Sequence, residues 1–408
     1  MQYRKPNWLC YRLAQIVSWF VATFVYHRRF KRNEIQGKKG PFVVIANHES
    51  MLDFVNLIGA TGRPMSFVIS HSFFSTLPIR GFLTKMGVIP KQQFQSTASD
   101  LKKIKRVIEN GEVVVIYPAG LMCEDGLSTP LPAATYKFLK WLDADVYMAK
   151  TQGTYFVMPK WSKKIRPGRT YMDIYRLFSR EELAAMELDR VQEKVEEVLM
   201  FDAYREQEKI MAPYKSGQDI CGLENVLYQC PHCAEEFSMT VQGGDTICCS
   251  RCGFEQVSDA YGFLHNRKGV GEELRRASDW SRRIHDRLKA RIGENPGLML
   301  TAQTQIHKIA PGQNRISPAG SGVLTLSRQG FTLDGQIYGE PVCLQIPIEG
   351  IPTLPFSPGR YLELQHGKDI YRCVLDDGRL AMKYIHMVKI FHALAREQMP
   401  VRKPVRVK

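Results

Sequence analysis

The sequence lacks an apolar run long enough to cross a bilayer. The longest uninterrupted run, residues 13–26, is shorter than the about 20 residues that a spanning helix needs. Basic residues follow this run directly and no small-residue cleavage site is visible, so we do not expect a secretory signal. Internal repeats and low-complexity tracts are also absent, which argues against a repeat architecture.

Acidic residues are scarce relative to basic ones. The chain has 41 Asp and Glu against 56 Lys and Arg, which gives a formal net charge of +15. An acidic partner is therefore expected, and phosphate head groups, coenzyme A phosphates and nucleic acid all qualify. With 408 residues and 44% hydrophobic content, the chain is long enough for two or three domains with sizeable cores.

The N-terminal segment, residues 1–32, combines an apolar stretch with a basic cluster. Residues 8–26 include Trp8 and Trp19, and residues 27–32 are mostly basic. We expect a helix that lies in the membrane interface or forms a single N-terminal anchor. The basic cluster after the helix would face anionic lipid on the cytoplasmic side, where each cation would add about 1 kcal/mol of binding free energy. A soluble helix packed on the following domain is the alternative.

Residues 33–215 alternate short apolar runs with helical stretches. This alternation predicts an α/β domain with a mostly parallel sheet flanked by helices. The expected strands are residues 42–46, 65–69, 88–89, 113–117 and 146–150. The expected helices are residues 52–60, 79–86, 100–109 and 135–142, followed by one charged helix over residues 180–209.

A polar heptapeptide, residues 47–53, follows the first expected strand and holds His48 and Asp53 five positions apart. Ligand sites favour such strand-to-helix turns. His48 is placed to take a proton from a hydroxyl while Asp53 fixes the imidazole tautomer. A structural interpretation is also open, because Ser50 and Asp53 fit a helix capping box.

Four blocks in this region, residues 47–53, 86–91, 117–123 and 146–153, resemble in order those of the 1-acyl-sn-glycerol-3-phosphate acyltransferases and their lysophospholipid acyltransferase relatives. The resemblance covers roughly residues 8–165. It implies an enzyme that moves a fatty acyl group from acyl-CoA or an acyl-carrier protein to a lysophospholipid hydroxyl, with His48 as general base and Asp53 as its partner. The residues it places at the substrate are Asn47, Ser50, Gly87, Lys91, Pro118 and Gly120.

The third block departs from the family pattern. The family usually has Pro-Glu-Gly-Thr-Arg there, whereas Ala119 and Met122 occupy the positions of the acid and the arginine. In the second block Gln93 stands where an arginine is common. Each lost charge-assisted contact would be worth about 1.5–3 kcal/mol. The acceptor therefore stays open: another cation (Lys91, Arg80 or Lys137) binds the phosphate, the acceptor is a different lysolipid, or catalysis has been lost.

Residues 216–262 have the cysteine spacing of a zinc ribbon. The pairs Cys230/Cys233 and Cys249/Cys252 each form a Cys-x-x-Cys motif, and four thiolates close a tetrahedral shell, so the sequence predicts a structural Zn²⁺ site. Cys248 beside Cys249 leaves one ligand ambiguous. The remaining cysteines show no pairing pattern, which favours a reducing compartment over disulfides.

The last part of the chain is predicted as a linking basic helix within residues 263–298 and a β-rich domain over residues 299–408. Six strands and a helix over residues 382–396 resemble a pleckstrin-homology or related lipid-sensing domain in layout. The six strands are expected at residues 299–309, 321–326, 330–333, 342–346, 360–365 and 370–374. The basic tail, residues 401–408, is expected to be mobile.

Three functions remain open on sequence grounds. The first is a membrane-associated acyltransferase, and the second is a non-catalytic lipid-binding adaptor. The third, a zinc-ribbon nucleic-acid binder, lacks the interleaved aromatic and basic residues that single-strand sites use around the ribbon. The ribbon and the C-terminal domain are expected to position the enzyme or to bind a protein partner.

Overall fold

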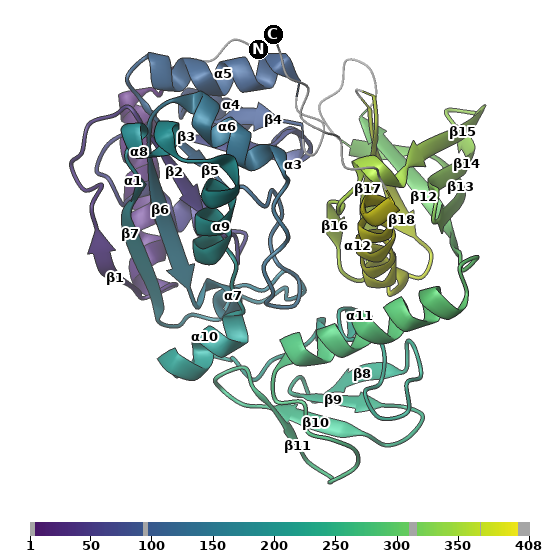
Figure 1. Cartoon of the computed structure of the whole chain (residues 1–408). Helices are drawn as coiled ribbons and strands as arrows, with labels where there is room; N and C mark the ends of the chain where they lie inside the picture. Colours follow the sequence, from purple (N-terminus) through teal and green to yellow (C-terminus); the bar gives the residue numbers. More distant parts are fainter. Residues whose placement is uncertain (1–4, 93–96, 310–315, 368, 399–408) are drawn as a thin grey trace. The chain divides into compact units, whose positions relative to one another are not determined.

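The computed structural model describes residues 5–92, 97–309, 316–367 and 369–398 (Figure 1). The chain forms two compact units, Met1–Ser281 and Arg282–Lys408. Helix α11, Ala277–Glu294, crosses the boundary between them. The first unit contains both the sheet domain and the cysteine-rich segment.

A seven-stranded sheet forms the centre of the first unit, in the order β1-β7-β6-β2-β5-β3-β4. All neighbouring strands are parallel except β6 and β7, so the predicted mostly parallel sheet is confirmed. The strands are β1 Arg28–Asn33, β2 Phe42–Ala46, β3 Ser66–Ser70, β4 Ile89–Lys91, β5 Val113–Ile116, β6 Asp145–Gln152 and β7 Thr170–Phe178.

Helices cover both faces of this sheet. Side chains alternate along β2: Phe42 and Val44 join one hydrophobic cluster, while Val43 and Ile45 join the other. A strand that is buried on both faces consists of consecutive apolar residues, as in other parallel sheets. The helices are α1 Trp8–Phe24, α2 Asp53–Ile58, α3 His71–Thr76, α4 Arg80–Lys85, α5 Ala98–Glu109, α6 Ala134–Leu142 and α7 Thr154–Val157.

The single charged helix expected over residues 180–209 is wrong. Three helices occupy this segment: α8 Arg180–Ala185, α9 Leu188–Leu199 and α10 Ala203–Ile210. The chain is extended at Met186 and Met200, and Asp202 begins α10 by accepting the N–H groups of Tyr204 and Arg205. These turns let α9 bury one apolar side against the sheet.

The cysteine-rich segment folds as a small antiparallel sheet in the order β11-β10-β9-β8. Its strands are β8 Met239–Gln242, β9 Thr246–Cys249, β10 Glu255–Ser258 and β11 Leu264–Asn266. The separate domain boundaries expected at residues 215 and 262 stay a prediction, since the segment belongs to the same compact unit as the large sheet.

The second unit is β-rich, as expected, with an antiparallel seven-stranded sheet in the order β15-β14-β13-β12-β18-β17-β16. The strand missed from the sequence is the two-residue β16. The pleckstrin-homology-like layout stays a prediction, and the basic tail lies outside the described residues. The elements are β12 Leu300–Ile309, β13 Ile316–Ser327, β14 Gly330–Ile337, β15 Glu340–Pro347, β16 Phe356–Ser357, β17 Tyr361–His366, β18 Asp369–Leu375 and α12 Leu380–Gln398.

Candidate active site and metal centre

The loop between β2 and α2 brings His48 and Asp53 together at the carboxyl end of the parallel strands. His48 Nδ1 lies 3.0 Å from Asp53 Oδ2. The His48 side chain is 20% exposed, whereas the Asp53 side chain is fully buried. A histidine that donates from Nδ1 to a buried carboxylate keeps Nε2 as the nitrogen able to accept a proton.

The Asp53 carboxylate is fixed by the loop itself. Its Oδ2 also accepts the backbone N–H groups of Glu49 and Ser50, each at 2.8 Å. The capping-box interpretation is wrong in one respect, because the residue before α2 is Leu52, not Ser50. The Ser50 hydroxyl lies 3.0 Å from the Tyr26 hydroxyl, so a hydrogen bond to Tyr26 fixes the Ser50 side chain.

Asn47 ties the loop to the end of β6. Its Oδ1 accepts the Thr151 N–H at 2.8 Å, and its Nδ2 donates to the Thr151 carbonyl at 2.8 Å and to Glu49 Oε1 at 2.9 Å. The whole amide is therefore committed to protein contacts. This arrangement favours positioning of His48 over direct contact with substrate for Asn47, whose assignment to the substrate stays a prediction.

Glu49 is a buried carboxyl group that the sequence reasoning missed. Its Oε2 accepts the Thr154 hydroxyl at 3.0 Å and the Tyr155 N–H at 3.1 Å. Burial raises the pKa of Glu49 well above its ordinary value, and the charges of Glu206 and Asp53 raise it further. No sequence signal identified it, since a glutamate between two polar residues is expected to face solvent.

The third block packs directly on this loop. The ring centroids of Tyr117 and His48 are 4.6 Å apart. The Cys123 N–H donates to the His48 carbonyl at 3.2 Å, and burial raises the pKa of the Cys123 thiol, so Cys123 packs and does not present a thiolate. Pro118 is buried, and Gly120 makes a turn with φ +70° in which its N–H donates to the Tyr117 carbonyl.

A small pocket lies beside His48. Its wall is mostly apolar. Among the described residues, no lysine or arginine lines it, so none of the three cations considered as phosphate ligands (Lys91, Arg80 and Lys137) does so. The apolar lining comprises Ala46, Ala119, Leu121, Leu131, Leu199 and Phe201.

The second block lies at the same edge of the sheet but away from His48. Lys91 ends β4, three strand positions from β2, which corresponds to about 14 Å at the usual strand spacing. Burial lowers the pKa of Lys91, whose Nζ donates to the Gln92 carbonyl. Gly87 is needed for packing, because a Cβ there would lie 2.7 Å from Pro6 Cγ. Gln93 lies outside the described residues.

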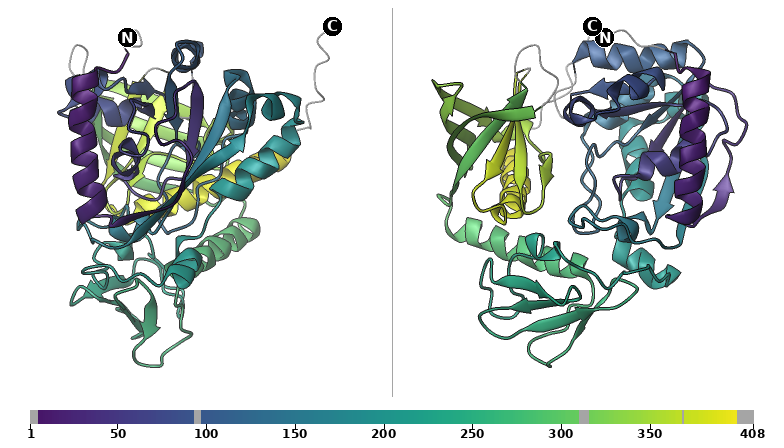
Figure 2. Two further views of the ribbon diagram at one scale, coloured as in Figure 1. Left: turned by 90° about the vertical axis from the view of Figure 1, so that its left-hand side faces the viewer. Right: turned by 180° about the vertical axis from the view of Figure 1, so that it is seen from behind.

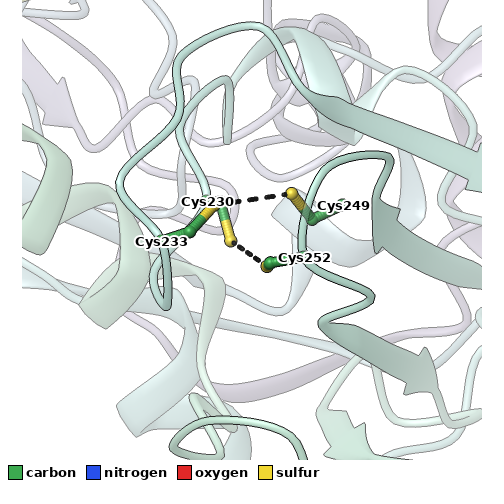
Figure 3. A group of neighbouring side chains, drawn as sticks. All are labelled: Cys230, Cys233, Cys249 and Cys252. Carbon is green, nitrogen blue, oxygen red and sulfur yellow. Dashed lines mark hydrogen bonds between the residues drawn. The ribbon is translucent and has the colours of Figure 1, made fainter.

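The four cysteines of the ribbon converge on one point (Figure 3). The sulfurs of Cys230 and Cys252 are 3.6 Å apart, those of Cys233 and Cys249 are 3.8 Å apart, and all four lie within 4.8 Å of one another. Four thiolates at 2.3 Å from a central ion would be about 3.8 Å apart in a tetrahedron. The geometry therefore fits a tetrahedral metal ion.

The environment of Cys249 favours a thiolate. Burial acts to raise its pKa, but hydrogen bonds from the Ser238 hydroxyl and from backbone N–H groups outweigh burial and lower the pKa to about 6. Cys248 is not in the cluster, since its sulfur lies 3.4 Å from the Thr240 hydroxyl. His232 is not in the cluster either.

Helix α1 packs on the first unit through Tyr11, Ala14, Ser18 and Ala22 and exposes a wide apolar side. Ser18 anchors the packed side: its hydroxyl donates to the Val55 carbonyl and accepts the Gly59 N–H. Both views of Figure 2 show α1 along the outside of this unit. The exposed side chains, 52% to 70% accessible, are Trp8, Leu9, Leu13, Ile16, Val17, Trp19, Phe20 and Phe24.

None of the helices in the described part of the chain combines the length and the apolar character needed to cross a membrane.

Residues 27–158 match the sequence model of the family named Acyltransferase. The match includes β1 to β6 and the whole loop with His48 and Asp53, and it covers less than half of the chain. Among solved structures, the chain is similar to the 1-acyl-sn-glycerophosphate (LPA) acyltransferase PlsC from Thermotoga maritima. That similarity has a TM-score of 0.41 and 16% sequence identity, over 49% of this chain and 79% of the other.

Proposed function

Taking the Acyltransferase-family domain at residues 27–158 as the premise, we propose that the protein transfers a fatty acyl group from a thioester to a hydroxyl of a lysophospholipid-type acceptor at a membrane surface. The observation that carries this proposal is the His48–Asp53 pair, 3.0 Å apart, within the matched residues. The thioester is acyl-CoA or an acyl-carrier protein.

In this proposal His48 is the general base. The acceptor hydroxyl gives its proton to Nε2 as its oxygen attacks the thioester carbonyl, and Asp53 stabilises the imidazolium. The attack forms the new C–O bond and gives a tetrahedral intermediate. Its collapse re-forms the carbonyl, breaks the C–S bond and returns the proton from His48 to the departing thiolate. No covalent enzyme intermediate is required, and holding both substrates beside His48 supplies part of the acceleration.

The assay that tests this function is product formation from labelled thioesters and a panel of lysolipids, with the purified full chain in detergent. Formation of an acylated lipid that depends on the protein is the expected result. Lipid binding without acyl product, for every acceptor and donor, would contradict the proposal and favour the non-catalytic adaptor.

The membrane part of the proposal rests on α1. Helix α1 has one packed side and one exposed apolar side, and basic residues follow it. Such a helix suits a position in the membrane interface, with its apolar side at the boundary between head groups and acyl chains. Strand β1, which follows α1, keeps its central residues Arg29, Phe30, Lys31 and Arg32 exposed. We propose that these cations meet anionic head groups.

Replacing four exposed residues of α1, Leu13, Ile16, Val17 and Phe20, by serine is expected to reduce flotation with anionic vesicles at least tenfold. Each lost side chain removes on the order of 1 kcal/mol of apolar burial in the interface, and 1.4 kcal/mol corresponds to a factor of ten.

The control for this experiment replaces exposed apolar residues elsewhere. Ile165, Met211, Met299 and Tyr338 are 45% to 61% exposed, and their replacement by serine should leave flotation unchanged. Equal flotation of the α1 variant and the unaltered protein would rule out α1 as the membrane contact.

We also propose that Cys230, Cys233, Cys249 and Cys252 hold a structural Zn²⁺. Four sulfur ligands leave no open position for a substrate, so the ion would stabilise the ribbon and take no part in acyl transfer.

A further inference from the structure

The third-block loop, residues 117–133, joins β5 to α6. All of its residues lie in the described part of the chain, and none belongs to a helix or strand. Loops of this length are uncommon unless they are functional, so contacts with other segments must fix its shape. We propose that Asp125, which is 5% exposed, is a positioning residue that holds this loop against the His48 loop, and that the first turn of α11 couples Asp125 to the cysteine ribbon. The inference rests on the proposed function, because it concerns the geometry of the same site.

The third-block loop contacts the backbone of the loop that carries His48. The Cys123 N–H donates to the His48 carbonyl at 3.2 Å, and the Cys123 thiol donates to the Glu49 carbonyl at 3.8 Å. A displacement of the third-block loop therefore moves the peptide that carries the imidazole. A displacement of about 1 Å at a reacting group can lower turnover by about 10²-fold.

The Asp125 carboxylate connects the third-block loop to α11. Its Oδ1 accepts the Leu127 N–H at 3.0 Å, and its Oδ2 accepts the Ser281 hydroxyl at 2.5 Å. Ser281 is also buried, at 1% exposure. Hydrogen bonds to an ionised group are stronger than those between neutral groups, and a buried site strengthens them further. The carboxylate therefore fixes its own turn and ties that turn to α11.

A neighbouring segment, the turn between α9 and α10, is held by the same part of α11. Leu127 forms an isolated antiparallel bridge with Asp202, and the Ser128 N–H donates to the Phe201 carbonyl at 3.1 Å. Asp202 Oδ1 accepts the Ser278 hydroxyl at 3.1 Å. Two buried serines in the first turn of α11 thus fix both the third-block loop and the segment paired with it.

The same turn of α11 packs on the ribbon (Figure 1). Trp280 is fully buried, its Nε1 donates to the Gln229 carbonyl at 2.8 Å, and its ring centroid lies 5.6 Å from that of Phe254. Gln229 directly precedes Cys230, and the Phe254 carbonyl accepts the Cys249 N–H at 2.8 Å. One helical turn therefore joins residues next to the four sulfurs with the third-block loop.

The first experiment measures hydrogen exchange of the full chain by mass spectrometry, which needs no substrate. Ser281→Ala removes a donor from the buried Asp125 carboxylate and is expected to speed exchange in the third-block loop at least about tenfold. Cys249→Ser removes a sulfur of the cluster and should have the same effect, because an unfolded ribbon releases the contacts of Trp280. Peptides from β2 should keep their protection in both variants, since the large sheet stays folded.

Ser258→Ala and Cys248→Ser are the matched controls. Ser258 is a buried serine of β10 whose hydroxyl donates to the Asp259 carbonyl, and the Cys248 sulfur faces Thr240. Both controls should leave exchange in the third-block loop unchanged. Unchanged exchange in Ser281→Ala, or in metal-free Cys249→Ser, would overturn the inference. If Cys249→Ser also loses the protection of β2, chelation of the unaltered protein replaces that variant, and unchanged loop exchange would again overturn the inference.

The second experiment measures acyl transfer. Asp125→Ala removes both hydrogen bonds that fix the turn and is expected to lower kcat at least about tenfold at an unchanged metal content. Asp125→Asn should stay within about threefold of the unaltered protein, because its amide oxygen still accepts the Leu127 N–H and its amide nitrogen can donate to Ser281. An equal loss in both variants, or full activity in Asp125→Ala, would overturn the positioning role. Absence of transfer by the unaltered, folded protein would refute the proposed function, while the exchange results still decide how the third-block loop is held.

Discussion

Replacement of His48 by alanine is expected to lower kcat/KM for acyl transfer by about 10²–10⁴-fold, the usual contribution of a positioned general base. The Nε2 atom that would accept the hydroxyl proton is lost, and water is a poor substitute because Asp53 can no longer stabilise the positive charge that forms. The measurement is initial rate against acceptor concentration, with the donor and acceptor pair that the panel selects.

The fold should survive this change. His48 is partly exposed, and its side chain contributes one hydrogen bond to Asp53, which keeps two backbone donors from Glu49 and Ser50. His71→Ala, at an exposed histidine that begins α3, controls for loss of an imidazole. Turnover in His48→Ala within a factor of two or three of that control, at an unchanged melting temperature, would end the general-base proposal.

The parts of the fold that were predictable are those in which a local pattern carries the structure. Residues 42–46 are all apolar and all buried in β2, so their sequence alone identifies the strand. The edge strand β1 was not predicted, because four of its six residues are Arg or Lys and it pairs with β7 from far along the chain. Backbone pairing with a distant strand stabilises β1, so its own residues do not need to alternate between apolar and polar, and the sequence shows no strand pattern there.

The same distinction applies to the candidate site. His48 and Asp53 share one loop, so their spacing was enough to suggest the pair. The pocket could not be predicted, since Leu199 ends α9, Phe201 lies in the turn after it, and both join His48 in the pocket lining only in the folded chain. The error of one long helix over residues 180–209 hid this turn. The break before α10 depends on Asp202, whose capping role competes with the helical pattern that the charged residues suggested.

Removal of the metal ion is expected to unfold the ribbon. Structural zinc contributes about 10–16 kcal/mol of free energy to the folding of small zinc domains. The small sheet formed by β8 to β11 buries too little surface to stay folded after losing that contribution. Purified protein should contain about one zinc per chain, and a strong chelator should remove it.

Trp280 reports the unfolding of the ribbon. Its side chain is fully buried, its ring packs edge-on against Phe254, and its Nε1 donates to the Gln229 carbonyl at 2.8 Å. Loss of the ribbon should expose it and shift tryptophan fluorescence to longer wavelength.

Two neighbouring cysteines provide the matched pair for this prediction. Cys249→Ser removes one of the four converging sulfurs and is expected to abolish stoichiometric zinc and give the same fluorescence shift without chelator. Cys248→Ser changes the adjacent residue, whose sulfur faces Thr240, and should keep both the metal and the fluorescence. Equal zinc content in the two variants would show that the convergence of the sulfurs does not reflect metal binding. A zinc content near zero in unaltered protein, purified without chelator, would contradict it as well, because the ion would then be unnecessary for a folded ribbon.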